Sequence, residues 1–128
     1  MHIEHINISA PKRIIEKEKT FFCTVFNLEV GFRPDFSRCG YWLYAHDKAV
    51  IHLTESEEHY STSKPSYIDH IAFQLTGLKQ MLQKLTELDI SFTTDSLPQI
   101  GMTQVFFKSP AGVGLEANFV NEALTSVT

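Results

Sequence analysis

Apolar and polar residues alternate along several short segments of the chain and recur at helical spacing in two others. Residues 2–8 (HIEHINI) alternate isoleucines with polar residues, as a half-buried strand does. Residues 10–28 carry apolar side chains mostly three or four positions apart, with charged residues between them, which predicts an amphipathic helix. Three further strands are predicted at 29–33, 40–45 and 49–55, because each is an apolar or aromatic run bounded by turn residues.

The second half of the chain repeats this order of elements. A strand is predicted at 67–75, a helix at 77–88, and three strands at 91–96, 103–109 and 113–119. Each half therefore reads strand, helix, strand, strand, strand, which predicts an α+β fold of two tandem βαβββ modules. Since neither copy can cover its own apolar face, we expect the copies to pack together.

The predicted modules fit one domain of 128 residues. Its parts are a first module at about 1–54, a polar linker at about 55–66, a second module at about 67–120 and a tail at about 121–128.

Composition narrows the range of partners. The chain is 43% hydrophobic and 20% charged, which is ordinary for a globular protein. Its net charge of -4, with no basic run, predicts no binding to nucleic acid or to an anionic membrane. No apolar run approaches membrane-spanning length and the first residues do not resemble a secretory signal, so we expect a cytoplasmic protein.

The repeat relates two pairs of chemically active side chains. When His5 is superposed on His70, His52 falls within one position of Glu116. Each pair, His5 with His52 and His70 with Glu116, comes from the first and last strand of its own module. Strand alternation directs Ile6 and its equivalents toward the helices, so these four side chains are expected on the sheet faces away from the helices.

Imidazoles together with a carboxylate form a ligand set for Fe(II), Mn(II), Ni(II), Co(II) or Zn(II). Such a set is too rich in nitrogen for calcium or magnesium, which prefer oxygen ligands. A lone histidine on a strand is more often an ordinary hydrogen-bonded residue, but a matched pair in a repeat favours the metal interpretation. Glu116 supports it, because an unpaired carboxylate in the apolar strand at 113–119 would be costly to bury.

Other histidines carry weaker signals. His52 could also support a metal ligand without binding the metal itself, contact the substrate, or be a partly exposed residue. His2, His46 and His59 lie at the terminus, in a turn and in the linker, and we expect all three at the surface.

These features resemble the vicinal oxygen chelate superfamily, which includes glyoxalase I, extradiol dioxygenases, fosfomycin-inactivating thiol transferases and bleomycin-resistance proteins. The resemblance spans about residues 3–120 and rests on five segments: EHINI, FFCTVFNLEV, GYWLYAHDKAVIHLTE, DHIAF and QVFFKSPAGVGLEANF. It implies two βαβββ modules that form a curved, half-open mixed sheet around a central cleft with a divalent metal, in a homodimer whose sites can draw on both chains.

Carried over by position, the resemblance implies metal ligands at His5, His70 and Glu116. His52 falls where glyoxalase I has a ligating glutamate or glutamine, so it could be a fourth ligand or an acid/base. Glu116 is likewise a candidate for proton transfer. A second departure is Ser109 in place of the usual turn aspartate, which concerns the turn and not the chemistry.

The resemblance leaves several reactions open. The shared chemistry is a metal that holds adjacent oxygens of a small organic substrate, as in an extradiol-type dioxygenase (an oxidoreductase) or a glyoxalase-like lyase or isomerase. The alternative is a non-catalytic protein of the bleomycin-resistance type, which traps a small molecule without a metal. Trp42 and Gln104, on strands expected to border the cleft, are the predicted substrate contacts in either case.

Overall fold

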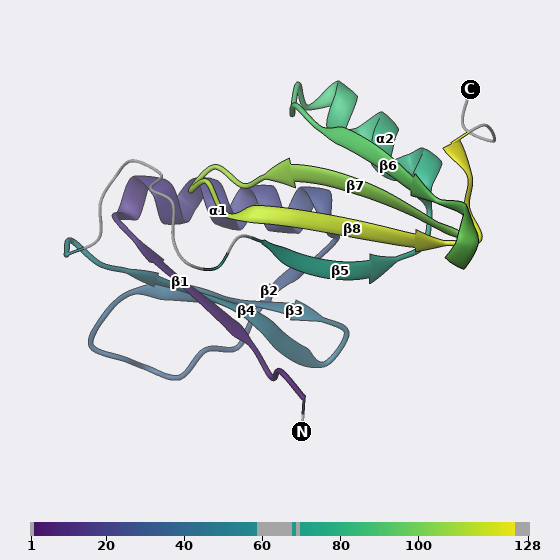
Figure 1. Cartoon of the computed structure of the whole chain (residues 1–128). Coiled ribbons are helices and arrows are strands. Elements are labelled where there is room, and N and C mark those ends of the chain that lie inside the picture. The colour runs from purple at the N-terminus through teal and green to yellow at the C-terminus, as the bar shows by residue number, and fades with distance from the viewer. Residues whose placement is uncertain (1, 59–67, 69, 125–128) are drawn as a thin grey trace. The chain divides into compact units, whose positions relative to one another are not determined.

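The computed structural model describes residues 2–58, 68 and 70–124. The chain divides into two compact units, Met1–Lys64 and Pro65–Thr128 (Figure 1).

The first unit is a four-stranded mixed sheet with one helix. Its elements are β1 (Ile6–Ala10), α1 (Lys12–Val25), β2 (Glu29–Gly31), β3 (Gly40–Ala45) and β4 (Lys48–Glu55). The strand order is β1-β4-β3-β2, in which β1 and β4 are parallel and the other neighbours are antiparallel. The first and last strands of the unit are therefore adjacent, which brings residues far apart in the sequence side by side.

Helix α1 covers one face of this sheet. It follows Pro11, whose fixed φ suits the start of a helix, and it buries Ile15, Phe22 and Val25. The sheet side of the core includes Leu43, Ile51 and Leu53, each at most 1% exposed.

A polar contact also joins the helix to the sheet. The Tyr41 hydroxyl on β3 donates a hydrogen bond of 2.6 Å to Oε1 of Glu16 on α1. Since side chains alternate along β3, Tyr41 and Leu43 face α1 while Trp42 faces the opposite, open side.

The second unit repeats the topology of the first. Its elements are β5 (Ile71–Leu75), α2 (Leu78–Glu87), β6 (Thr93–Leu97), the short helix η1 (Pro98–Ile100), β7 (Met102–Lys108) and β8 (Gly114–Val120). The strand order is β5-β8-β7-β6, again with one parallel pair, β5 with β8. The α+β class and the two tandem βαβββ modules predicted from the sequence are thus confirmed.

The start of α2 depends on a residue from the end of the unit. Gly77 precedes the helix in a left-handed conformation (φ 92°) and has no side chain with which to cap it. The Glu122 carboxylate accepts hydrogen bonds from the backbone N–H groups of Gly77 and Leu78, the latter at 2.8 Å. This carboxylate satisfies N–H groups that a helix start leaves without partners.

Several details differ from the sequence predictions or fall beyond the described residues. The short helix η1 was not predicted; it begins at Pro98, and Gly101 (φ 61°) ends it. Strand β5 begins at Ile71, and Tyr67 and Asp69 of the predicted strand lie outside the described residues.

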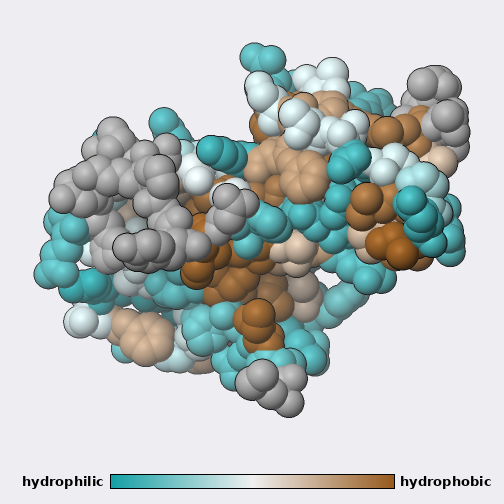
Figure 2. All heavy atoms as spheres, viewed as in Figure 1, coloured by the Kyte–Doolittle hydropathy of each residue, from teal (hydrophilic) through white to brown (hydrophobic). Residues whose placement is uncertain are grey.

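Apolar side chains also reach the surface. Figure 2 shows hydrophobic residues among hydrophilic ones on the face in view. Among the described residues, the exposed large apolar side chains are those of Ile3, Val30, Phe32, Phe36, Ile68, Leu88, Ile100 and Val120. No helix in the described part of the chain is long and apolar enough to cross a membrane.

Candidate metal and substrate site

The strand register places His52 and Glu116 at the same position of the repeat. In the first unit, Asn7 on β1 lies opposite His52 on β4. In the second unit, Ala72 on β5 lies opposite Glu116 on β8. Since Asn7 and Ala72 both come two residues after the repeated histidine, the one-residue offset in sequence spacing disappears in the structure.

The second unit brings His70 and Glu116 together. His70 immediately precedes β5, Glu116 lies in the middle of β8, and His70 Nε2 is 3.3 Å from Glu116 Oε1. The Glu116 side chain is 10% exposed and the His70 side chain 43% exposed. A nearly buried carboxylate therefore has one oxygen beside an imidazole that is open to solvent.

The other Glu116 oxygen is held by two amides. Asn118 Nδ2 donates to Oε2 at 2.7 Å, and Gln104 Nε2 donates to the same oxygen at 3.1 Å. These bonds compensate the carboxylate for its burial, because an ionised acceptor strengthens a hydrogen bond. Neither amide contacts Oε1 in these bonds, which leaves that oxygen for His70 or for a ligand.

The spacing of the His70–Glu116 pair fits a shared metal ion. Two ligand atoms about 2.1 Å from one ion, with an angle of about 90–110° between them, lie about 3.0–3.4 Å apart. The observed separation of 3.3 Å falls in that range. Imidazole nitrogen and carboxylate oxygen are also the donors that first-row divalent metals accept.

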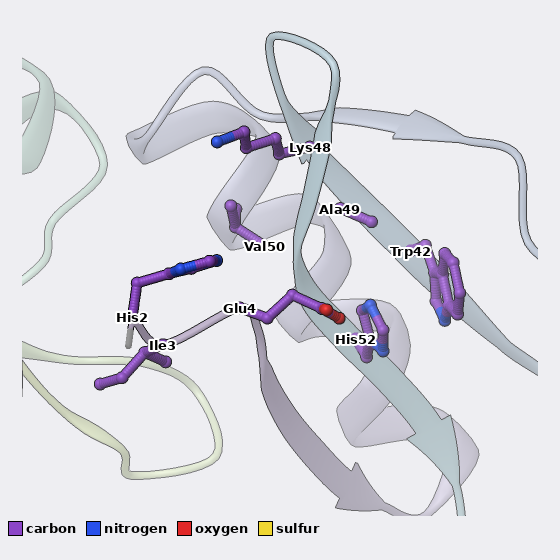
Figure 3. Close-up of a pocket in the computed structure, with 8 residues that line it drawn as sticks. All are labelled: His2, Ile3, Glu4, Trp42, Lys48, Ala49, Val50 and His52. Atoms are coloured by element: carbon purple, nitrogen blue, oxygen red, sulfur yellow. The ribbon is translucent and has the colours of Figure 1, made fainter.

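The first unit brings His5 and His52 together in a different way. Their rings are stacked, with centroids 3.8 Å apart and an interplanar angle of 10°. The other face of His52 stacks on Trp42, with centroids 4.1 Å apart and an interplanar angle of 11°. His52 is thus the middle ring of a stack formed by Trp42, His52 and His5, and Figure 3 shows Trp42 and His52 face to face.

The stack constrains what His52 can do. A ring-nitrogen lone pair lies in the plane of its ring, so two nearly parallel rings do not direct their lone pairs to one point. In the observed arrangement, His5 and His52 therefore do not both bind the same ion. Burial, and secondarily the neighbouring His5, lower the pKa of His52 below 6.5, which favours the neutral imidazole.

A pocket of about 340 Å³ opens beside this stack (Figure 3). Residues from the N-terminal segment and from β3 and β4 line it: His2, Ile3, Glu4, Trp42, Lys48, Ala49, Val50 and His52. Flat rings, small apolar side chains and both signs of charge therefore face a volume suited to a small organic molecule. The predicted substrate contact Trp42 lines this pocket, and so does the exposed His2.

The structure thus assembles the two pairs that the sequence predicted. Among the described residues, no group of three or more His, Cys, Asp or Glu side chains is close enough to hold a metal ion. Gln104, predicted to contact substrate, donates a hydrogen bond to Glu116 within the second unit. His46 lies exposed in the turn before β4, as expected, and His59 lies outside the described residues.

Two interactions were not anticipated from the sequence. One is the pair of amide bonds from Asn118 and Gln104 to Glu116. Asn118 could have been suspected, because two residues of separation on a strand place it on the same face as Glu116. The other is the stacking of Trp42 on His52, which follows from their direct opposition in the β3–β4 ladder.

No protein-family model and no curated protein matches the chain. Solved structures do match it over nearly its whole length. A glyoxylase/bleomycin resistance protein/dioxygenase domain from Frankia sp. EAN1pec has a TM-score of 0.76 at 16% identity, covering 96% of this chain and 94% of its own. A glyoxalase family protein from Bacillus anthracis has a TM-score of 0.73 at 20% identity, covering 94% of this chain and 95% of its own.

A third similar structure contains a metal. It is a mutant of the genomically encoded fosfomycin resistance protein FosX from Listeria monocytogenes, complexed with Mn(II) and 1S,2S-dihydroxypropylphosphonic acid. Its TM-score is 0.72 at 16% identity, and the match covers 97% of this chain and 94% of that one. The chain therefore has the vicinal oxygen chelate fold, as its repeated pattern suggested.

Proposed function

We propose that the protein is a divalent-metal-dependent enzyme of the glyoxalase or dioxygenase type. The observation that carries this proposal is the His70–Glu116 pair, whose 3.3 Å separation suits a shared ion. Both amide donors bind Oε2 of Glu116 and neither binds Oε1. A purely structural ion pair would not need this arrangement, whereas a metal ligand does. The substrate would be a small organic molecule with two adjacent oxygens.

His70 and Glu116 would be two of the protein ligands, and His5 would be the third. The metal would be a first-row divalent ion: Fe, Mn, Ni, Co or Zn. When bound, such an ion supplies Lewis-acid stabilisation of negative charge that develops on substrate oxygens. The FosX complex, with Mn(II) and a vicinal diol, is consistent with this class of ligand.

His52 would act beside the metal instead of on it. Its ring stacks on His5 and lines the pocket, and its lowered pKa keeps it neutral near pH 7. A neutral imidazole at a pocket wall can accept a proton from a bound molecule, which is the role of a general base. Glu116 Oε1 is the second candidate for proton transfer, and Trp42 would contact the substrate.

One observation favours a second function, a metal-free small-molecule binding protein of the bleomycin-resistance type. The pocket beside Trp42 is lined by residues of the first unit. A protein that only traps a ligand could use these walls alone. It would have no use for the carboxylate oxygen presented to His70.

We also propose that the protein is cytoplasmic and forms a homodimer. The dimer is proposed because the fold is associated with dimers whose sites can draw on two chains. Analytical ultracentrifugation of the untagged protein should give twice the mass of one chain. A monomer at micromolar concentration would remove this part of the proposal.

The metal content of purified protein tests the proposed function. Untagged protein should carry about one first-row metal ion per chain, measured by plasma mass spectrometry, and His70→Ala and Glu116→Ala should lose it. The identity of the metal would then select the chemistry: iron indicates a dioxygenase, and nickel or zinc an isomerase or lyase.

His46→Asn is the matched control. It removes an exposed histidine from a turn where φ is 57°, a conformation that asparagine tolerates. This variant should keep its metal. If the wild type holds no metal and takes up none of the five candidate ions, the enzyme proposal fails and the binding protein replaces it.

A further inference from the structure

The two oxygens of Glu116 have different surroundings. Oε2 accepts hydrogen bonds from Asn118 Nδ2 at 2.7 Å and from Gln104 Nε2 at 3.1 Å. Oε1 is 3.3 Å from His70 Nε2. The carboxylate is therefore fixed by one oxygen and available at the other.

The sheet register produces this asymmetry. Gln104 on β7 and Asn118 on β8 lie directly opposite each other, and Asn118 is two residues beyond Glu116 on the same face of β8. On the other side of Glu116, the pairing of Ile71 with Leu115 places His70 beside Gly114 when the ladder is extended by one residue. Both amides therefore approach Glu116 from one end of the strand and the imidazole from the other.

The orientation of the Asn118 amide favours the hydrogen bond to the Glu116 carboxylate over a hydrogen bond to its own Oδ1. Its Oδ1 is buried and has no hydrogen-bond partner within the described part of the chain. If the amide were rotated to exchange Oδ1 and Nδ2, Oδ1 would face the Glu116 carboxylate, and two acceptor oxygens would lie against each other. The structure thus leaves one acceptor unpaired while it keeps two donors on Oε2.

We propose that Asn118 and Gln104 are positioning residues that restrict Glu116 to binding a metal through Oε1 alone. The inference rests on the proposed function. A glutamate that binds through both oxygens occupies two coordination positions, whereas one held in this way occupies one. The position saved is available to the second oxygen of a substrate with adjacent oxygens.

Cobalt(II) is a suitable probe, because its visible absorption reports the number and arrangement of its ligands. The metal-free wild type and the variants Asn118→Ala and Gln104→Leu would be titrated with Co(II) against a competing chelator. We expect each variant to bind Co(II) about 10- to 100-fold more weakly than the wild type. Their Co(II) spectra should also change, with the weaker bands that accompany an added carboxylate oxygen.

Gln74→Leu is the matched control. Gln74 lies opposite Asn118 on β5, on the same sheet face, and donates neither of the two amide bonds to Glu116. It should leave both the Co(II) affinity and the spectrum unchanged. Circular dichroism of each metal-free variant checks folding, and the partly exposed Gln104 provides the test if Asn118→Ala does not fold.

The outcomes separate the two proposals. If the wild type binds Co(II) and both amide variants bind it with the same affinity and spectrum, the positioning role is wrong and the proposed function stands. If the wild type itself binds no Co(II), the proposed function fails and the positioning role fails with it. A loss in Gln74→Leu as large as in the amide variants would also overturn the inference, because the effect would not be specific to Glu116.

Discussion

His52 and Glu116 occupy the same position in the two repeated units, yet their surroundings differ. His52 lies between two rings, 4.1 Å from the centroid of Trp42 and 3.8 Å from that of His5. Glu116 receives two amide hydrogen bonds and lies 3.3 Å from His70. One copy of the repeat thus holds this side chain by stacking and the other by hydrogen bonding, so of these two equivalent residues we propose Glu116, and not His52, as a metal ligand.

Replacing Glu116 with glutamine should weaken metal binding more than it destabilises the fold. The side chains have the same shape, but the amide has no charge and is a poor ligand for a first-row ion. We expect Mn(II) affinity to fall by more than about tenfold in isothermal titration calorimetry. This loss should be larger than the loss caused by replacing a residue that contacts only the substrate. Unchanged affinity in Glu116→Gln would remove this residue from the ligand set.

Replacing His52 with alanine should destabilise the first unit and alter the fluorescence of the protein. His52 is 8% exposed and its ring stacks on both faces, so the loss of the ring should cost about 1–2 kcal/mol in unfolding free energy. Trp42 is the single tryptophan of the chain, so emission reports directly on this contact. His46→Asn should change neither property, and equal effects of the two variants would show that the stack contributes nothing particular.

The Tyr41–Glu16 bond predicts a pH-dependent contribution to stability. The hydrogen bond from Tyr41, and secondarily the neighbouring Lys19, lower the pKa of Glu16 below 4.5. As pH falls, the unfolded chain therefore takes up this proton before the folded chain does. The stabilisation is fully present above about pH 4.5 and is lost as pH falls through the folded pKa.

Tyr41→Phe should therefore cost about 0.5–1 kcal/mol at pH 7, a value reduced because the Glu16 side chain is partly exposed. The cost should shrink when urea unfolding of the variant and the wild type is repeated near pH 3. An equal cost at both pH values would mean that the charge of Glu16 is not what the hydroxyl stabilises.

Glu122 should stabilise the second unit from outside its helix. Its carboxylate accepts the N–H groups of Gly77 and Leu78 at the start of α2, a place where negative charge is favourable. We expect Glu122→Ala to lower the unfolding free energy by about 1–2 kcal/mol in urea titrations. Glu87→Ala, at the other end of α2, should stay within about 0.5 kcal/mol, and a reversed order would contradict the capping role.

The fold could be predicted because its signals are local. Apolar spacing identified both helices, and the alternation around Ile6 and Ile71 assigned the repeated histidines to the open faces. The parallel pairing of the first and last strands of each unit was not among these predictions and comes from the structure. Superposing the two halves of the sequence placed His52 within one position of Glu116, and in the structure the two residues occupy the same position of the repeat.

The details of the site depend on information that is not local. The role of Gln104 follows from the register of the β7–β8 hairpin, and a shift of one residue would have turned its side chain to the opposite face. The stacking of Trp42 on His52 depends on side-chain rotamers as well as on strand pairing. Glu122 lies in the segment predicted as a tail, and its contacts with Gly77, Leu78 and Thr103 show that it belongs to the second unit.

An anomalous difference map from crystals of the untagged protein soaked with Mn(II) tests most directly whether His70 and Glu116 bind a metal. We expect a strong peak about 2.0–2.3 Å from both His70 Nε2 and Glu116 Oε1, with a third contact to His5. Glu116 Oε2 should remain on its two amides and out of contact with the ion. A peak that touches neither His70 nor Glu116, or no peak at saturating metal, would show that these residues are not metal ligands.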